Sequence, residues 1–213
     1  DAQWEAVVQK SLERYLPMKA ATFIVPLCEM LDHVLNVEIK CGDASFKLSQ
    51  VSNANKCNEL EFDMKVEQMH LPLLAALNSD TVQMQHIDAA AYYGIMNGSM
   101  DLFFEHDGKY YILDWKSNYL GDHVEDYAPE LLVEAMNENN YHLQYHIYTL
   151  AAKRFLQSRL PDFDYERDFG GVLYLFVRGI RKDSVNGVFS AKLPIEKLAQ
   201  LEAVFPLQTQ LQR

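Results

Sequence analysis

The chain has 213 residues, 49% of them hydrophobic and 23% charged, which fits one large domain with a sizeable core. Its formal net charge of −11 is unexpected for a DNA-binding protein, because phosphate binding depends largely on Lys and Arg. No apolar run approaches the roughly 20 residues of a membrane span, and no secretory signal stands at the N-terminus.

The three cysteines, Cys28, Cys41 and Cys57, are odd in number and widely spaced. This pattern argues against a disulfide framework and against a zinc or iron–sulfur site, so we expect reduced thiols and a cytoplasmic location. The chain begins with Asp1 and not with Met, and we therefore expect a fragment of a longer protein.

The first part of the chain predicts two helices and a strand. Residues 2–16 carry apolar side chains at helical spacing and precede Pro17, which indicates an amphipathic helix, and a second short helix is expected over 26–35. Residues 40–58 are polar and are expected to form mostly a connection. Over residues 59–67, apolar side chains alternate with charged ones, which predicts a half-buried strand.

Residues 98–117 predict a β-hairpin. Asp107 and Gly108 form a turn pair between two β-prone runs, which is a strong hairpin signal. With these two residues as the loop, His106 faces Lys109 across the hairpin.

The remainder of the chain predicts helices around one fully buried strand. The run at 170–177 is apolar at almost every position, as in a central strand covered on both faces. Helices are expected at residues 72–77, 129–136, 141–160 and 195–205. The order of these elements predicts an α/β fold with a mixed central sheet flanked by helices.

The register of the hairpin places Asp101 directly opposite Asp114, with Cβ atoms roughly 5 Å apart. Lys116 lies two residues beyond Asp114 and points to the same face. The turn and the separation of the two faces both support this register. The opposite face is expected to carry a continuous core surface formed by Met100, Leu102, Phe104, Tyr111, Leu113 and Trp115.

Two opposed carboxylates repel each other, and one of them has a raised pKa unless a cation lies between them. Mg²⁺ is typically held by one or two carboxylates together with water and substrate phosphate. Lys116 adds a positive charge beside a metal-bound water or a scissile phosphate, so we interpret the cluster as a metal-dependent phosphodiesterase site. The alternative is a surface ion pair between Asp114 and Lys116, with Asp101 solvated.

Further candidates lie outside the hairpin. Gln144 and Tyr148 are four residues apart and share one helix face, where they would contact DNA or brace the lysine; a core tyrosine with a boundary glutamine is the alternative. On the polar face of the strand at 59–67, Glu61 is preferred to Glu59 as an additional metal ligand. A solvated strand face is the alternative for both glutamates.

Two other groups of residues have weaker signals. His142 and His146 stand four apart without a third ligand, so packing or solvent exposure is expected in place of a zinc site. Arg178, Arg181 and Lys182 follow the buried run as a basic cluster, which fits either phosphate contact or a solvated loop.

Four segments carry a family resemblance: Gly98–Leu102, Ile112–Asn118, Gln144–Tyr148 and Asp164–Gly179. They resemble motifs of the PD-(D/E)XK nuclease superfamily and, more narrowly, those of the C-terminal nuclease domains of the RecB family. The resemblance is strong over residues 92–180 and weaker toward the N-terminus. Its combination of motifs is highly specific, whereas a lone Asp-x-Lys would not be.

The resemblance implies that Asp101 and Asp114 bind Mg²⁺, with Mn²⁺ or Ca²⁺ able to substitute in binding. It also implies that Lys116 is the catalytic lysine and that the main-chain carbonyl of Trp115 completes the coordination. The segment 144–148 would correspond to the Gln-x-x-x-Tyr motif of RecB-like nucleases.

The implied substrate is DNA, cut during double-strand-break repair and recombination by a RecBCD-type helicase–nuclease. The implied partners are the RecC and RecD subunits, with RecA as a further contact. Residues 1–213 would form a single domain with a restriction-endonuclease-like fold. Given the net charge of −11, either the negative charge lies away from the site or other subunits hold the DNA and deliver a strand, and we favour the second.

The chain departs from the family pattern in one respect. RecB-like nucleases usually carry another metal-ligating histidine upstream of the region that matches Trp4, and none of the seven histidines here occupies that place. We therefore expect the isolated fragment to bind metal weakly or to be inactive, and its full-length parent to be competent.

Two other classes of protein are alternatives to a RecB-type nuclease. The competing hypothesis is a non-catalytic interaction module that docks on RecA or RecC, which the truncated metal site and the acidic charge favour. A Cas4-like or AddB-like exonuclease shares the core motifs but usually holds an iron–sulfur cluster with four cysteines. The three scattered cysteines of this chain exclude such a cluster.

Overall fold

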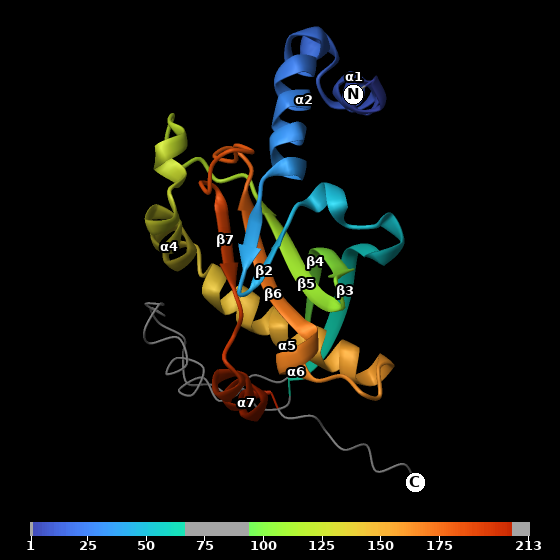
Figure 1. Cartoon of the computed structure of the whole chain (residues 1–213), viewed down its shortest axis with the longest axis vertical. Coiled ribbons are helices and arrows are strands. Elements are labelled where there is room, and N and C mark those ends of the chain that lie inside the picture. The colour runs from blue at the N-terminus through green and yellow to red at the C-terminus, as the bar shows by residue number, and fades with distance from the viewer. Residues whose placement is uncertain (1, 67–93, 206–213) are drawn as a thin grey trace.

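The structure, a computed structural model, describes residues 2–66 and 94–205 (Figure 1). The helix predicted at 72–77 lies outside the described residues. In the part of the chain that is described, no helix has the length and apolar character needed to cross a membrane.

A five-stranded mixed sheet forms the centre of the molecule (Figure 1). Its strands, in spatial order, are β3 (Lys56–Val66), β4 (Gly94–His106), β5 (Lys109–Lys116), β6 (Phe169–Phe176) and β7 (Val188–Ala191). Neighbouring strands are antiparallel except for β5 and β6, which run parallel. The parallel pair follows from the helical crossover between these two strands, since parallel neighbours need a long connection. The predicted α/β class with a mixed sheet flanked by helices is confirmed.

Helices cover one face of the sheet, and a smaller assembly covers the other (Figure 1). The first face packs against α4 (Pro129–Glu138), α5 (Tyr141–Arg159) and α7 (Ile195–Val204). The second face packs against the end of α2 (Ala20–Asn36) and a two-stranded sheet of β1 (Ile39–Cys41) and β2 (Ala44–Phe46). Within the described ranges, the other α-helices are α1 (Ala2–Tyr15) and the short α6 (Tyr165–Asp168). Together, α1 and α2 extend beyond one end of the sheet (Figure 1).

Strand β6 is buried at all eight positions, which confirms the prediction of a central strand covered on both faces. Successive side chains of β6 point to opposite faces of the sheet. Val172 packs in the core on the α5 side, and Leu173 packs in the core on the α2 side. The parallel register pairs these residues with Ile112 and Leu113 of β5, which divide in the same way. Together β5 and β6 form a rigid platform between two hydrophobic layers.

The small β1–β2 sheet was not predicted, because residues 40–58 read as a polar connection. Ile39, Cys41 and Phe46 are nevertheless buried against the main sheet. The turn between β1 and β2 uses Gly42 at a positive φ of 59°. A hairpin this short has too few alternating residues to produce a clear period of two, so only its packing reveals it.

The β4–β5 hairpin has the predicted register. His106 pairs with Lys109, and the ladder continues to Leu102 opposite Leu113. The turn residue Asp107 has a positive φ of 50°, and the Gly108 that follows it also has a positive φ, as a two-residue turn of the mirror-image type requires.

The predicted apolar face of this hairpin is confirmed in part. Leu102, Phe104, Tyr111 and Leu113 lie in the core on the α2 side, as expected. The prediction was wrong for two residues: Met100 lies in the core on the α5 side, and Trp115 is 38% exposed.

The break in alternation at Met100 has a local cause. The β4–β5 ladder ends at Leu102, and Asp101 is not paired in it. On the other side of β4, Asp101 is also skipped in the ladder with β3, where the facing Glu59 has a positive φ of 51°. The kink at this point turns the residues before Asp101 toward the opposite face, so period-two counting fails there.

Candidate active site at the end of strand β5

The two predicted acidic residues lie together at the end of β5. Asp114 is 4% exposed, and Asp101 on β4 is partly buried. Asp101 Oδ2 accepts a hydrogen bond of 2.8 Å from the main-chain N–H of Trp115, which anchors this carboxylate beside β5. Burial raises the pKa of Asp114, the nearby charge of Asp101 raises it further, and Lys116 opposes both effects. The site therefore concentrates negative charge that a cation would stabilise.

Lys116 is the third member of the cluster, and its ammonium group is held from several directions. Its Nζ lies 2.7 Å from Asp114 Oδ2 and donates a hydrogen bond of 3.0 Å to Gln144 Oε1. The same Nζ lies 3.8 Å from the centre of the Tyr141 ring and 4.9 Å from that of Tyr174. Since Lys116 is only 8% exposed, these contacts fix the position of a charge that is largely removed from water.

Gln144 and Tyr148 connect Lys116 to the main chain of β4. Gln144 Nε2 donates to the Tyr148 hydroxyl at 3.0 Å, and that hydroxyl donates to the main-chain oxygen of Ser99 at 2.8 Å. Burial raises the pKa of Tyr148 to about 12, so the hydroxyl keeps its proton. Of the two roles considered for this pair, bracing the lysine matches the observed contacts.

Two tyrosines of the site were not predicted. The Tyr174 hydroxyl donates to Gln144 Oε1 at 3.0 Å, and the Tyr141 hydroxyl donates to Asn118 Oδ1 at 3.1 Å. Tyr141 had a detectable signal, because it precedes Gln144 by three residues on the same helix face. Tyr174 had no detectable signal in the sequence, because its position opposite Asp114 depends on the parallel pairing of β5 with β6.

The donor set suits a hard divalent cation. Two carboxylates, Asp101 and Asp114, leave room for the water and phosphate ligands that Mg²⁺ retains. Within residues 2–66 and 94–205, no three His, Cys, Asp or Glu side chains are grouped closely enough to hold a metal ion. Glu61 is exposed on β3 opposite Ser99 and is not brought into such a group. The carbonyl of Trp115 stays a predicted ligand.

The histidine pair on α5 belongs to the core. His142 and His146 are 6% and 5% exposed, and their rings lie 5.5 Å and 4.5 Å from that of Tyr145. Burial lowers the pKa of both, that of His146 to about 4, and the charge of Lys197 adds to this effect. For His142 and His146 we expected either packing or solvent exposure, and both histidines are packed in the core.

The buried His146 predicts a pH-dependent stability. Its pKa in the folded state, about 4, lies below its ordinary value of 6.5, so the unfolded chain binds the proton first as the pH falls. This histidine therefore lowers the free energy of unfolding by up to roughly 3 kcal/mol as the pH falls from about 6.5 to about 4. Urea unfolding across this range should show a smaller loss for His146→Leu than for the wild type. The exposed His123 provides the control, since His123→Leu should leave the loss unchanged.

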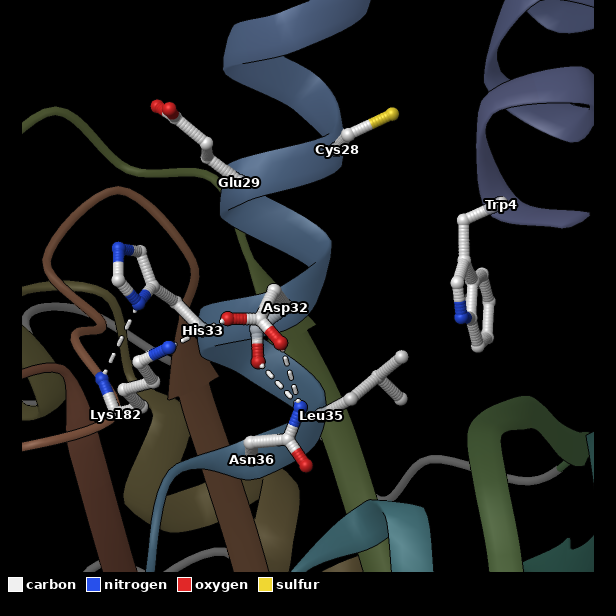
Figure 2. A pocket seen from close by; sticks show the side chains of 8 residues that line it. All are labelled: Trp4, Cys28, Glu29, Asp32, His33, Leu35, Asn36 and Lys182. Carbon is white, nitrogen blue, oxygen red and sulfur yellow. Dashed lines mark hydrogen bonds and ion pairs between the residues drawn. The ribbon is translucent and has the colours of Figure 1, made fainter. Parts of the chain in front are cut away.

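A separate cavity of about 800 Å³ lies between α1 and α2 (Figure 2). Trp4 of α1 and Cys28 of α2 line it, and at its base Lys182 Nζ lies 3.0 Å from Asp32 Oδ2 (Figure 2). None of the residues of the candidate active site lines this cavity. Cys28, Cys41 and Cys57 are free thiols.

The arrangement of the sheet and helices indicates the fold class. A mixed five-stranded sheet flanked by helices is compatible with a restriction-endonuclease-like fold, and the Asp101, Asp114 and Lys116 cluster lies on its central strands. No protein-family model matches the chain.

The chain is similar to RecB over most of its length. It is 43% identical over 193 residues to "RecBCD enzyme subunit RecB" of Haemophilus influenzae, which covers 86% of this chain and 15% of that protein. It is 35% identical over 189 residues to RecB of Escherichia coli K12, which covers 84% of this chain and 16% of that protein. RecB of Mycobacterium tuberculosis H37Rv is 44% identical over 88 residues, or 41% of this chain and 8% of that protein. The chain is therefore homologous to a segment of RecB, although it spans less than a fifth of the length of these relatives.

Proposed function

We propose that this chain is a Mg²⁺-dependent nuclease domain of a RecBCD-type helicase–nuclease, which hydrolyses phosphodiester bonds of DNA in double-strand-break repair and recombination. The observation that carries the proposal is the buried Asp114 at the end of β5, which pairs with Lys116 and feels the charge of Asp101. The homology to RecB supports the same assignment, with RecC and RecD as partner subunits.

In this proposal, Asp101, Asp114 and the Trp115 carbonyl hold the Mg²⁺. Bound Mg²⁺ would activate a water molecule and offset the negative charge of the phosphate. Lys116 holds a fixed positive charge next to Asp114. There it would stabilise the negative charge that develops on a scissile phosphate in the transition state. Gln144 acts as a positioning residue, because its side-chain oxygen fixes the ammonium of Lys116.

The proposal is tested by incubating the purified 213-residue chain, and the complex that contains its full-length parent, with labelled DNA and Mg²⁺. Cleavage by the parent complex that stops when EDTA removes the metal is the expected result, with weak or no cleavage by the isolated chain. Titration calorimetry with Mg²⁺ and with Ca²⁺ provides a readout other than activity, and Asp101→Asn should weaken the binding of both ions. Cleavage by the parent complex that persists in EDTA would contradict the metal-dependent assignment.

The aromatic contact to Lys116 predicts a specific effect at Tyr141. Tyr141→Leu removes the ring that lies 3.8 Å from Lys116 Nζ and should lower kcat roughly tenfold with little change in KM. Tyr141→Phe keeps the ring and loses only the hydrogen bond to Asn118, so its kcat should stay near the wild-type value. Equal losses in the two variants would show that the hydroxyl, and not the ring, matters.

The second candidate function is a non-catalytic module that docks on RecA or RecC. The net charge of −11 favours it, as does the lack of a three-ligand metal group among the described residues. Pull-down of RecA and of RecC with the 213-residue chain, performed beside the cleavage assay, separates the two functions. Cleavage by the chain would contradict a purely docking role.

A further inference from the structure

A cavity of about 220 Å³ lies between the segment that follows β5 and the loop that follows β6. Tyr119, Asp122, Arg178 and Arg181 are among the residues that line it. We propose that this cavity binds one backbone phosphate of the DNA strand through the guanidinium groups of Arg178 and Arg181. The inference rests on the proposed nuclease function, since it assigns a substrate-binding site next to the candidate active site.

Arg178 is fixed to the main chain of the residue that follows the candidate catalytic lysine. Its Nε donates a hydrogen bond of 2.9 Å to the main-chain oxygen of Ser117. The preceding residue, Val177, donates its N–H to the main-chain oxygen of Lys116 at 3.0 Å. The Arg178 side chain forms no other hydrogen bond or ion pair with the described residues, and it is exposed. Its two terminal nitrogens therefore present the planar fork that suits a phosphate.

Arg181 is also held in place by main-chain contacts. Its Nη1 donates to the main-chain oxygen of Ile180 at 2.7 Å and to that of Arg178 at 3.4 Å. No carboxylate within the described parts of the chain forms an ion pair with it. Two ordered guanidinium groups thus face one small cavity, so binding an anion there requires little loss of side-chain entropy.

The charges around the cavity match a single phosphodiester. Asp122 also lines the cavity, and its Oδ1 accepts a hydrogen bond of 2.9 Å from the Tyr119 hydroxyl. Nearby, Asp126 Oδ2 accepts a hydrogen bond of 2.8 Å from the main-chain N–H of His123, which stabilises the loop. Of the charged groups that line the cavity, two guanidinium groups oppose one carboxylate, which leaves one positive charge for one phosphate.

The location of the cavity fits a strand that passes the candidate active site. Tyr119 is three residues beyond Lys116, a chain length of at most about 11 Å. Phosphates of one DNA strand are spaced about 3.4 Å along a duplex, so the cavity lies within a few nucleotides of the lysine. The Tyr119 ring is 64% exposed beside the arginines and offers a surface on which a base can stack.

The test measures binding of a fluorescein-labelled single-stranded oligonucleotide to the 213-residue chain by anisotropy, in EDTA and over a range of NaCl concentrations. Arg178→Gln and Arg181→Gln should each raise Kd about fivefold at low salt. The double variant should reduce the slope of log K against log salt by about 0.7, the value for one phosphate contact on a single strand. Arg159→Gln removes the same charge from an exposed residue at the end of α5 and should leave Kd within about twofold.

The outcomes separate this site from the proposed function. Arginine-dependent binding, together with a full-length parent complex that does not cleave DNA in Mg²⁺, would support the phosphate site and contradict the nuclease assignment. Binding that is absent in the wild type, or the same in the arginine variants as in Arg159→Gln, would overturn the phosphate site whether or not the chain cleaves DNA. Because Arg178→Gln also removes the hydrogen bond to Ser117, Arg181→Gln decides the result if thermal denaturation shows that Arg178→Gln is unfolded.

Discussion

Asp114→Asn is expected to lower DNA cleavage at least about 100-fold, because it removes the charge of a proposed metal ligand from a site with two carboxylates. The same change should abolish Mg²⁺ binding in calorimetry. In the proposed parent helicase–nuclease, DNA unwinding should continue, since the substitution affects only the proposed nuclease site. Single-turnover cleavage assays with labelled DNA measure the loss.

The hairpin itself offers a matched control. Asp107→Asn makes the same chemical change at the exposed turn, at the far end of the two strands, and asparagine is well suited to its positive φ. Cleavage by this control should stay at the wild-type rate. Wild-type cleavage by Asp114→Asn, with the control equally active, would exclude Asp114 as a metal ligand.

Lys116→Met is expected to lower kcat by about 100-fold or more, because it removes the positive charge proposed to stabilise the transition state. Metal binding should persist, because both carboxylates remain, and this separates Lys116→Met from Asp114→Asn. The variant also leaves the buried Asp114 without its ion-pair partner at 2.7 Å, which should cost about 3 kcal/mol of stability without metal. Added Mg²⁺ should restore part of that loss in thermal denaturation.

Lys109→Met is the control for this prediction. Lys109 begins the same strand that Lys116 ends, and it is only partly buried near the turn. It should retain cleavage and show little change in melting temperature. A Lys116→Met protein that cleaves DNA normally would show that the lysine only pairs with Asp114, which was the alternative interpretation of the cluster.

The hairpin combines a correctly predicted register with two wrongly placed side chains. The pairing of His106 with Lys109 was predictable, because an Asp-Gly turn fixes the register of the strands that it joins. The same counting placed Met100 on the wrong face and Trp115 in the core. These errors arise where the ladder breaks at Asp101, and a break of this kind leaves no mark in a pattern of alternating residues.

The sequence by itself determined the elements whose causes are local. These are the turn of the hairpin, the eight-residue buried strand β6 and the long helix α5, together with the proximity of Asp101, Asp114 and Lys116. Residues close along the chain, or related by one tight turn, have few alternative arrangements. Their chemistry could therefore be inferred before any packing was known.

The tertiary structure alone decided how that cluster is completed. Gln144 reaches Lys116 because α5 packs across the sheet, and Tyr174 reaches Gln144 because β6 lies parallel to β5. Arg178 comes to the end of β5 through the same strand pairing. Such contacts join residues 28 to 61 positions apart, and their geometry depends on how whole layers pack, which no local pattern encodes.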